Sequence, residues 1–75
     1  MQAIRDNDRM RIHLNGKPID LPAASTVAQL LLQQGLAERR VAVEVNGAIV
    51  SRNAHAAQRL QEDDRVEIVH ALGGG

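Results

Sequence analysis

The sequence of 75 residues contains no cysteine and no aromatic residue. Without cysteine the chain has no disulfide, no thiolate metal site and no thiol nucleophile, so any sulfur that it handles must be held by another group. Without aromatic side chains it lacks the platforms on which nucleic-acid bases stack. Nine basic and nine acidic residues cancel, which removes the positive charge that sequence-independent nucleic-acid binding requires. We therefore expect no nucleic-acid partner.

Long apolar runs are absent as well. No run approaches the roughly 20 apolar residues that a membrane-spanning helix needs, and the N-terminal stretch MQAIRDNDRM lacks the apolar region of a secretory signal. We expect a cytoplasmic protein with no membrane partner. A chain of this length forms one domain, which buries only about 60% of the surface that the unfolded chain exposes.

The first half of the chain predicts a hairpin followed by a helix. Residues 1–9 are polar and show no period, which predicts a mobile N-terminal arm. Residues 10–21 then alternate between apolar and polar side chains on either side of Asn15-Gly16, the dipeptide that favours the tight type I′ turn of a hairpin. Because Pro18 has no N–H to donate, we expect the second strand at an edge of the sheet.

The segment STVAQLLLQQGL, residues 25–36, changes to the helical period. Thr26 and Gln29 have the spacing of an N-terminal capping box, and Gly35 suits the left-handed residue that ends many helices. The side chains predicted to share one helical stripe are Val27, Leu30, Leu31 and Gln34.

The second half returns to strands. Residues 41–50, VAVEVNGAIV, predict another hairpin, residues 51–60 predict at most one helical turn, and residues 65–70, RVEIVH, predict a final strand. We therefore expect an α+β fold for residues 10–70, with one main helix packed across a four- to five-stranded mixed sheet. If the last strand lies parallel to the first, the connection between the two hairpins is a right-handed crossover. That arrangement is the ubiquitin-like β-grasp.

The stretches VAVEVNGAIV, RVEIVH and ALGGG resemble the ThiS family of sulfur carriers in thiamine biosynthesis, over residues 10–75. The chain departs from the family pattern at two places. The turn before the last strand, often Asp-Gly-Asp in such proteins, reads Asp63-Asp64-Arg65 here, and residues 1–9 extend beyond the usual start. Neither departure touches the glycine-rich end.

The resemblance implies that the carboxylate of Gly75 is the reactive group. A ThiF-like adenylating enzyme would consume ATP to activate it, sulfur from a persulfide donor would displace AMP to leave a thiocarboxylate, and thiazole synthase would accept that sulfur. The chain would be a protein cosubstrate rather than an enzyme, with no bound cofactor. We expect the tail to enter the partner's active site, because its glycines have no Cβ and its five residues span about 17 Å when extended. The residues of this tail before Gly75 are Ala71, Leu72, Gly73 and Gly74.

Other candidate sites have simpler interpretations. The three histidines, His13, His55 and His70, are far apart in sequence, and we expect no metal site from them. The acidic run Glu62, Asp63 and Asp64 has the composition of a solvated turn. Ser25 and Ser51 have no neighbouring histidine and aspartate that would activate a nucleophile.

A carrier must also present a surface beside its tail. The outward positions of the two long strands predict a docking face that mixes apolar and acidic groups, although an ordinary solvated face has the same composition. Two other functions remain open: a sulfur carrier of the molybdopterin-synthase type, and a ubiquitin-like interaction module with an inert tail. The residues of the predicted docking face are Ala42, Glu44, Glu67 and Val69, with Leu72 at the root of the tail.

Overall fold

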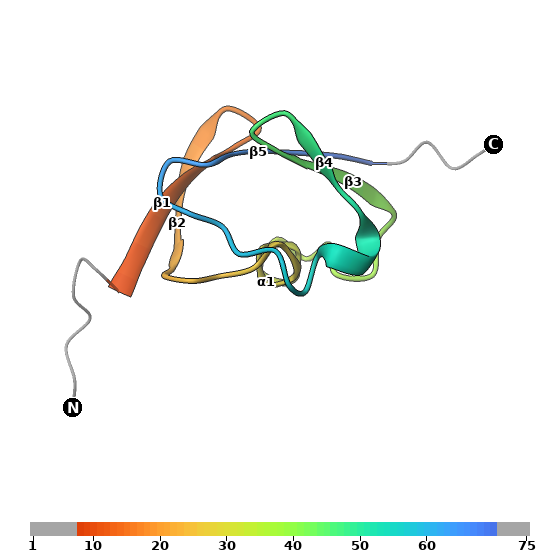
Figure 1. The fold of residues 1–75 in the computed structure, drawn as a ribbon, viewed down its shortest axis with the longest axis horizontal. Coiled ribbons are helices and arrows are strands. Elements are labelled where there is room, and N and C mark those ends of the chain that lie inside the picture. Colours follow the sequence, from red (N-terminus) through yellow and green to blue (C-terminus); the bar gives the residue numbers. More distant parts are fainter. Residues whose placement is uncertain (1–7, 71–75) are drawn as a thin grey trace.

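The computed structural model describes residues 8–70. Five strands form one mixed sheet in the order β2-β1-β5-β3-β4, and helix α1 packs across one face of it (Figure 1). Strand β5 runs parallel to β1 and antiparallel to β3, so the predicted α+β fold and its crossover connection are confirmed. The elements are β1 Arg9–Leu14, β2 Lys17–Pro22, α1 Val27–Gln33, β3 Val41–Val45, β4 Ala48–Val50, a 3₁₀ helix Arg52–Ala54, and β5 Arg65–His70.

Both hairpins turn at an Asn-Gly dipeptide, as the sequence predicts. Asn15 and Gly16 have φ angles of 49° and 86°, and Asn46 and Gly47 have 53° and 87°. Two successive left-handed residues are what a type I′ turn requires, and its twist matches that of the flanking strands. Strand β2, which contains Pro18, lies at the sheet edge where a missing N–H is tolerated.

Regular structure begins slightly before the predicted start at Met10. Arg9 is the first residue of β1 and pairs with Pro22 of β2. The N–H of Ala23 donates a hydrogen bond of 2.9 Å to the carbonyl oxygen of Asp8. The sheet therefore includes the last residue of the segment predicted as an arm, while residues 1–7 of that segment lie outside the described part of the chain.

Helix α1 has the predicted caps at both ends. The N–H of Gln29 donates to Thr26 Oγ1 at 3.2 Å and the N–H of Thr26 donates to Gln29 Oε1 at 2.8 Å, which completes the capping box. At the other end Gly35 has φ +75°, and the N–H of Leu36 reaches back to the carbonyl of Leu31 at 2.7 Å, as in a Schellman motif. Of the four residues predicted to share one helical stripe, Val27, Leu30 and Leu31 are buried, whereas Gln34 is the C-cap and its side chain is exposed.

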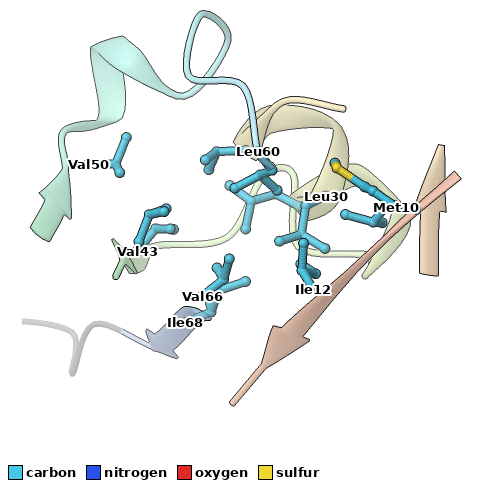
Figure 2. Close-up of a cluster of buried hydrophobic side chains, with 12 residues drawn as sticks. Met10, Ile12, Leu30, Val43, Val50, Leu60, Val66 and Ile68 are labelled. Carbon is cyan, nitrogen blue, oxygen red and sulfur yellow. The ribbon is translucent and has the colours of Figure 1, made fainter. Parts of the chain in front are cut away.

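The core is a single layer of aliphatic side chains between the helix and the sheet (Figure 2). Every strand contributes at least one buried residue, and Ile12, Val43 and Val66 on the three inner strands have no exposed surface. The buried hydrophobic residues are Met10, Ile12, Leu21, Val27, Leu30, Leu31, Val43, Val45, Val50, Leu60, Val66 and Ile68.

The segment between β4 and β5 closes the N-terminal end of α1. After the 3₁₀ helix, the carbonyl oxygens of His55 and Gln58 accept the N–H groups of Ala28 and Val27, each at 2.9 Å. These N–H groups belong to the first turn of the helix, which has no partner for them of its own. Leu60 then enters the core with 3% of its surface exposed. The predicted single helical turn is thus confirmed, and the rest of the segment serves as a helix cap.

Two turn asparagines hold β5 in the sheet. Asn15 Nδ2 donates to the carbonyl of Ile68 at 3.1 Å, and Asn15 Oδ1 accepts the N–H of the same residue at 2.8 Å. Asn46 Oδ1 accepts the N–H of Arg65 at 2.8 Å, and Asn46 Nδ2 donates to Asp64 Oδ1 at 2.9 Å. Each hairpin therefore uses the asparagine of its turn as a side-chain partner for the central strand or for the turn that leads into it.

The contribution of the first asparagine is testable with Asn15→Gly. Glycine keeps the left-handed turn without strain and removes both hydrogen bonds to Ile68. We expect the free energy of unfolding to fall by about 1–3 kcal/mol, because a net hydrogen bond contributes about 0.5–1.5 kcal/mol. Urea unfolding followed by far-UV circular dichroism measures the change. Asn15→Asp keeps an acceptor and loses the donor, so its free energy of unfolding should lie between those of the unaltered protein and Asn15→Gly. An unchanged urea midpoint for Asn15→Gly would contradict this role.

Candidate functional site

The candidate site begins where β5 ends. His70 is the last residue of the strand and the last that the structure describes. The predicted reactive residue, Gly75, and the predicted tail residues 71–74 lie outside the described part of the chain. The structure therefore fixes the position from which the tail starts, at the end of the central strand and on the side of β3 (Figure 1).

The four residues of the predicted docking face are brought together on the outer face of the sheet. Ala42 of β3 lies directly opposite Val69 of β5, and Glu44 lies directly opposite Glu67. All four are exposed, whereas Val43 and Val45 of β3 and Val66 and Ile68 of β5, which alternate with them, are buried in the core. The docking face thus forms a compact patch across two paired strands, directly beside the start of the tail.

Ile49 belongs to the same patch, although the sequence analysis did not include it. It lies opposite Glu44 on β4, and 76% of its surface is exposed. The sequence offered only the alternation of the strand, in which successive residues point to opposite faces, and the structure shows that Val50 is the buried one. Together with Val69, which is 58% exposed, Ile49 gives the docking face two large apolar side chains that flank the acidic pair.

The docking face contains an acidic pair. Glu44 and Glu67 face each other across β3 and β5, and neither forms an ion pair within residues 8–70. Like charges directly opposite on neighbouring strands destabilise a sheet. A shallow hollow beside them is lined by both glutamates and by Asn46, Gly47 and Arg65.

The other half of the outer face carries an ion pair. Arg11 Nε donates to Asp20 Oδ1 at 2.9 Å across the paired strands β1 and β2. This hydrogen bond from the guanidinium lowers the pKa of the Asp20 carboxyl, and the same contact raises the pKa of Arg11. Both side chains remain largely accessible to water, so solvent screens the attraction.

The remaining candidates do not form a second site. His13 Nε2 lies 4.0 Å from Asp63 Oδ1, His55 Nε2 lies 3.1 Å from the carbonyl of Val50, and His70 is at the end of β5. Among the residues that the structure describes, no three metal-ligating side chains gather. Ser25 is buried, and its hydroxyl donates to the carbonyl of Pro22 at 2.7 Å.

The acidic turn before β5 is structural rather than merely solvated. Glu62 Oε1 accepts the N–H of Arg11 at 3.1 Å, and the N–H of Asp63 donates to the carbonyl of Arg11 at 2.7 Å. Asp64 Oδ2 accepts the N–H of Gln61 at 2.8 Å. Asp63 itself has φ +69°, a left-handed conformation that aspartate tolerates better than most residues. The turn therefore supplies hydrogen-bond partners to β1 along the stretch where β5 has not yet begun.

Within residues 8–70, no helix has the length and apolar character needed to cross a bilayer. The longest helix of that region, α1, has seven residues.

The geometry of a β-grasp sheet with a strand that leads into a glycine-rich end agrees with the comparison with known proteins. A profile of the ThiS family matches residues 3–75. The chain belongs to the ThiS family. A crystal structure of the thiamine biosynthesis protein ThiS from Geobacter metallireducens has a TM-score of 0.77 and 33% identity, and the match covers 88% of this chain and 100% of that one.

Longer proteins also contain a segment that is similar to this chain. The thiazole synthase of Magnetococcus marinus is 52% identical over 66 residues, which cover 88% of this chain and 20% of that protein. The thiazole synthase of Paramagnetospirillum magneticum is 38% identical over the same length and coverage. The chain therefore spans about a fifth of the length of these curated relatives. A third relative, the protein ycf40 of Porphyra purpurea, is 26% identical over 92% of this chain and 97% of that one.

The ion pair on the outer face predicts a pH dependence of stability. The folded-state pKa of Asp20 lies below its ordinary value of 3.8, so the pair stabilises the folded state above the ordinary pKa and this contribution is lost as the pH falls through the lowered pKa. We expect Asp20→Asn to be slightly less stable than the unaltered protein at pH 7, with the difference vanishing as the pH falls below the lowered pKa of Asp20. Urea midpoints across this range measure it. Glu38→Gln, which removes an exposed carboxylate outside the sheet, is the control, and an Asp20→Asn difference that persisted at low pH would contradict the assignment.

Proposed function

We propose that this protein is a sulfur carrier in the biosynthesis of the thiazole ring of thiamine. The observation that carries the proposal is the match to the ThiS family over residues 3–75, which includes the ending ALGGG. The position of β5 supports it, since the strand delivers the tail from the middle of the sheet beside an exposed apolar and acidic face.

The first chemical step is activation of the Gly75 carboxylate. A carboxylate is a poor electrophile, and attack of its oxygen on the α-phosphorus of ATP expels pyrophosphate and gives an acyl-adenylate with AMP as a good leaving group. The ATP belongs to a ThiF-like adenylating enzyme, and we assign no bound cofactor to the carrier. The step requires Gly75 to be the last residue of the mature chain, and measuring the intact mass of the purified protein tests this requirement.

The second step introduces sulfur. The terminal sulfur of a persulfide donor attacks the acyl carbon and AMP leaves, which forms an acyl disulfide between Gly75 and the donor. A second thiolate then attacks the donor's sulfur in this S–S bond, so that a new disulfide forms between that thiol and the donor and the thiocarboxylate leaves. The persulfide must sit on another protein because this chain has no cysteine. Thiazole synthase is the acceptor in this proposal, supported by two thiazole synthases that contain a segment similar to this chain.

The residues of the tail suit entry into a partner's active site. Gly73, Gly74 and Gly75 carry no Cβ that would collide with the walls of a narrow channel. Ala71 and Leu72 add small and aliphatic side chains and keep their N–H groups, which a proline would remove. The fold alone would suit a molybdopterin-type carrier equally well, and the family match favours the thiamine carrier. The cytoplasmic location remains a prediction from the sequence.

The role of the Gly75 carboxylate is testable by changing its position in the chain. We expect addition of one residue after Gly75, or deletion of Gly75, to abolish pyrophosphate exchange by the adenylating enzyme, because the reacting group is then displaced by a residue length, about 3.4 Å. Thermal melts should match those of the unaltered protein. With enzyme, ATP and a persulfide donor, the unaltered protein should gain the mass of one oxygen-to-sulfur exchange. Normal pyrophosphate exchange by the extended variant would contradict the proposal. An unaltered protein whose mass does not change would also contradict it.

We further propose that the adenylating enzyme contacts the docking face, Ala42, Glu44, Ile49, Glu67 and Val69. Apolar side chains exposed next to a reactive tail are suited to the buried centre of a protein interface. Val69 supplies such a side chain directly opposite Ala42, with 58% of its surface exposed.

The docking face is testable with a matched pair of substitutions. Val69→Asp should raise the KM for the carrier in pyrophosphate exchange by about tenfold, which corresponds to about 1.4 kcal/mol. Leu32→Asp is the control, since Leu32 is 68% exposed but lies on α1, on the opposite side of the sheet. An equal effect of both substitutions would indicate a general loss of stability, and no effect of Val69→Asp would place the interface elsewhere.

A further inference from the structure

A long stretch of the chain has no charged side chain. Residues 21–37 contain neither a basic nor an acidic residue, although 24% of the whole chain is charged. The fold uses this stretch for the end of β2, the turn that follows it and helix α1. Helix α1 covers the face of the sheet opposite to the docking face (Figure 1). The outward side of α1 is therefore a second surface, which the proposed carrier chemistry does not use.

This second surface contains a hollow of about 370 Å³ between α1 and the turn that precedes it. Leu32 lies at the hollow with 68% of its surface exposed. The two other large apolar side chains that are exposed within residues 8–70, Ile49 and Val69, both belong to the docking face. The helix thus has its own exposed apolar side chain next to a hollow. The exposed residues around the hollow, which we name the helix face, are Pro22, Ala23, Ala24, Gln29, Leu32 and Gln33.

Hydrogen bonds hold the turn that forms one wall of the hollow. The N–H and the hydroxyl of Ser25 both donate to the carbonyl oxygen of Pro22, at 3.2 and 2.7 Å, and the carbonyl of Ser25 accepts the N–H of Leu60 at 2.8 Å. Ala24 has φ +67°, a left-handed conformation that is unfavourable for alanine and that these hydrogen bonds maintain. The hollow is therefore formed before anything binds, which lowers the entropy cost of filling it.

An exposed side chain and a hollow on one surface are complementary to a second copy of that surface. In a two-fold symmetric pair each contact occurs twice, so Leu32 of each copy can occupy the hollow of the other. A surface without charge also meets its own copy without like-charge repulsion. We propose that two copies of this protein associate through their helix faces, with Leu32 of one copy packed against Pro22 and Ala24 of the other.

The small size of the helix face makes this dimer a weak one. Helix α1 has seven residues and is therefore about 10 Å long, whereas stable interfaces bury about 1,200–2,000 Å² in total. A neighbouring hollow, lined by Asp8, Arg9 and Asp20, borders the helix face with charges of both signs, as in the polar rim of many interfaces. We expect a dissociation constant of about 0.1–1 mM. The docking face of each copy stays accessible in the pair, because it lies on the opposite face of the sheet, so association and adenylation are separable.

Sedimentation equilibrium of the full chain tests the association. From about 0.01 to 1 mM, the average mass should rise from 8.1 kDa toward twice that value. Ala24→Asp places a carboxylate at each hollow and Ala24→Gly leaves the hollow open, and both new residues tolerate the left-handed conformation better than alanine does. We expect Ala24→Gly to associate like the unaltered protein and Ala24→Asp to associate at least about tenfold more weakly. A mass that stays at 8.1 kDa, or equal association of the two variants, would overturn the proposal.

Amide chemical shifts measured by NMR over the same dilution series locate the contact. The shift changes should be confined to the helix face and α1, and Leu32→Asp should remove them while its circular dichroism stays unchanged. Changes centred on Ala42 and Val69 would place the contact at the docking face and contradict the proposal. If deletion of residues 1–7 shifts the helix-face amides at every concentration, the occupant of the hollow is that segment of the same chain, and the dimer is wrong. None of these outcomes bears on the carrier function, which pyrophosphate exchange tests separately.

Discussion

Strand β5 is the one element that joins the two hairpins into a single sheet. In the order β2-β1-β5-β3-β4, neither strand of the first hairpin touches a strand of the second. The strand pairing that joins the two hairpins in the sheet therefore runs through the hydrogen bonds of β5. The strand also contributes two buried side chains, Val66 and Ile68. The same central strand leads into the proposed reactive tail.

The helix and the sheet depend on each other because each is too small to be stable alone. Helix α1 has seven residues, far fewer than the roughly 12–15 at which isolated helices become even marginally stable in water. Its stability comes from three buried side chains and from loop carbonyls at its first turn. The core contains no aromatic residue, so it is filled by close contact among aliphatic side chains. A chain of 75 residues that has no cysteine to form a disulfide builds its core in this way from aliphatic contacts alone.

Short sequence patterns predicted the helix, the strands and their turns. Contacts between residues far apart in the sequence determined the features that no such pattern indicated. The Asn-Gly turns, the capping box at Thr26 and the helix end at Gly35 each depend on residues within one turn of one another, and each was recognisable. The pairing of Asn15 with Ile68 joins positions 53 residues apart. No pattern near Asn15 distinguishes an asparagine that only turns the chain from one that also holds a strand.

The acidic turn illustrates the same limit, and so does the candidate site. Glu62, Asp63 and Asp64 have the composition of a solvated turn, yet their hydrogen bonds to Arg11 and Asn46 could be assigned only once the strand order was known. The docking face was predicted from alternation within two strands. Ile49 was missed, although alternation within β4 points it outward, because its contribution depends on β4 pairing with β3 at Glu44.

The outer face of the sheet contains a conflict that the fold does not require. Glu44 and Glu67 repel each other across neighbouring strands, whereas the other half of the same face places Arg11 opposite Asp20 and gains an attraction. Natural sequences tend to keep such local conflicts where function needs them. A basic group on a partner, seated between the two glutamates and flanked by Ile49 and Val69, would convert the repulsion into attraction at the moment of binding. Under the proposed function, the cost in the free protein would then contribute to the preference for the complex with the adenylating enzyme.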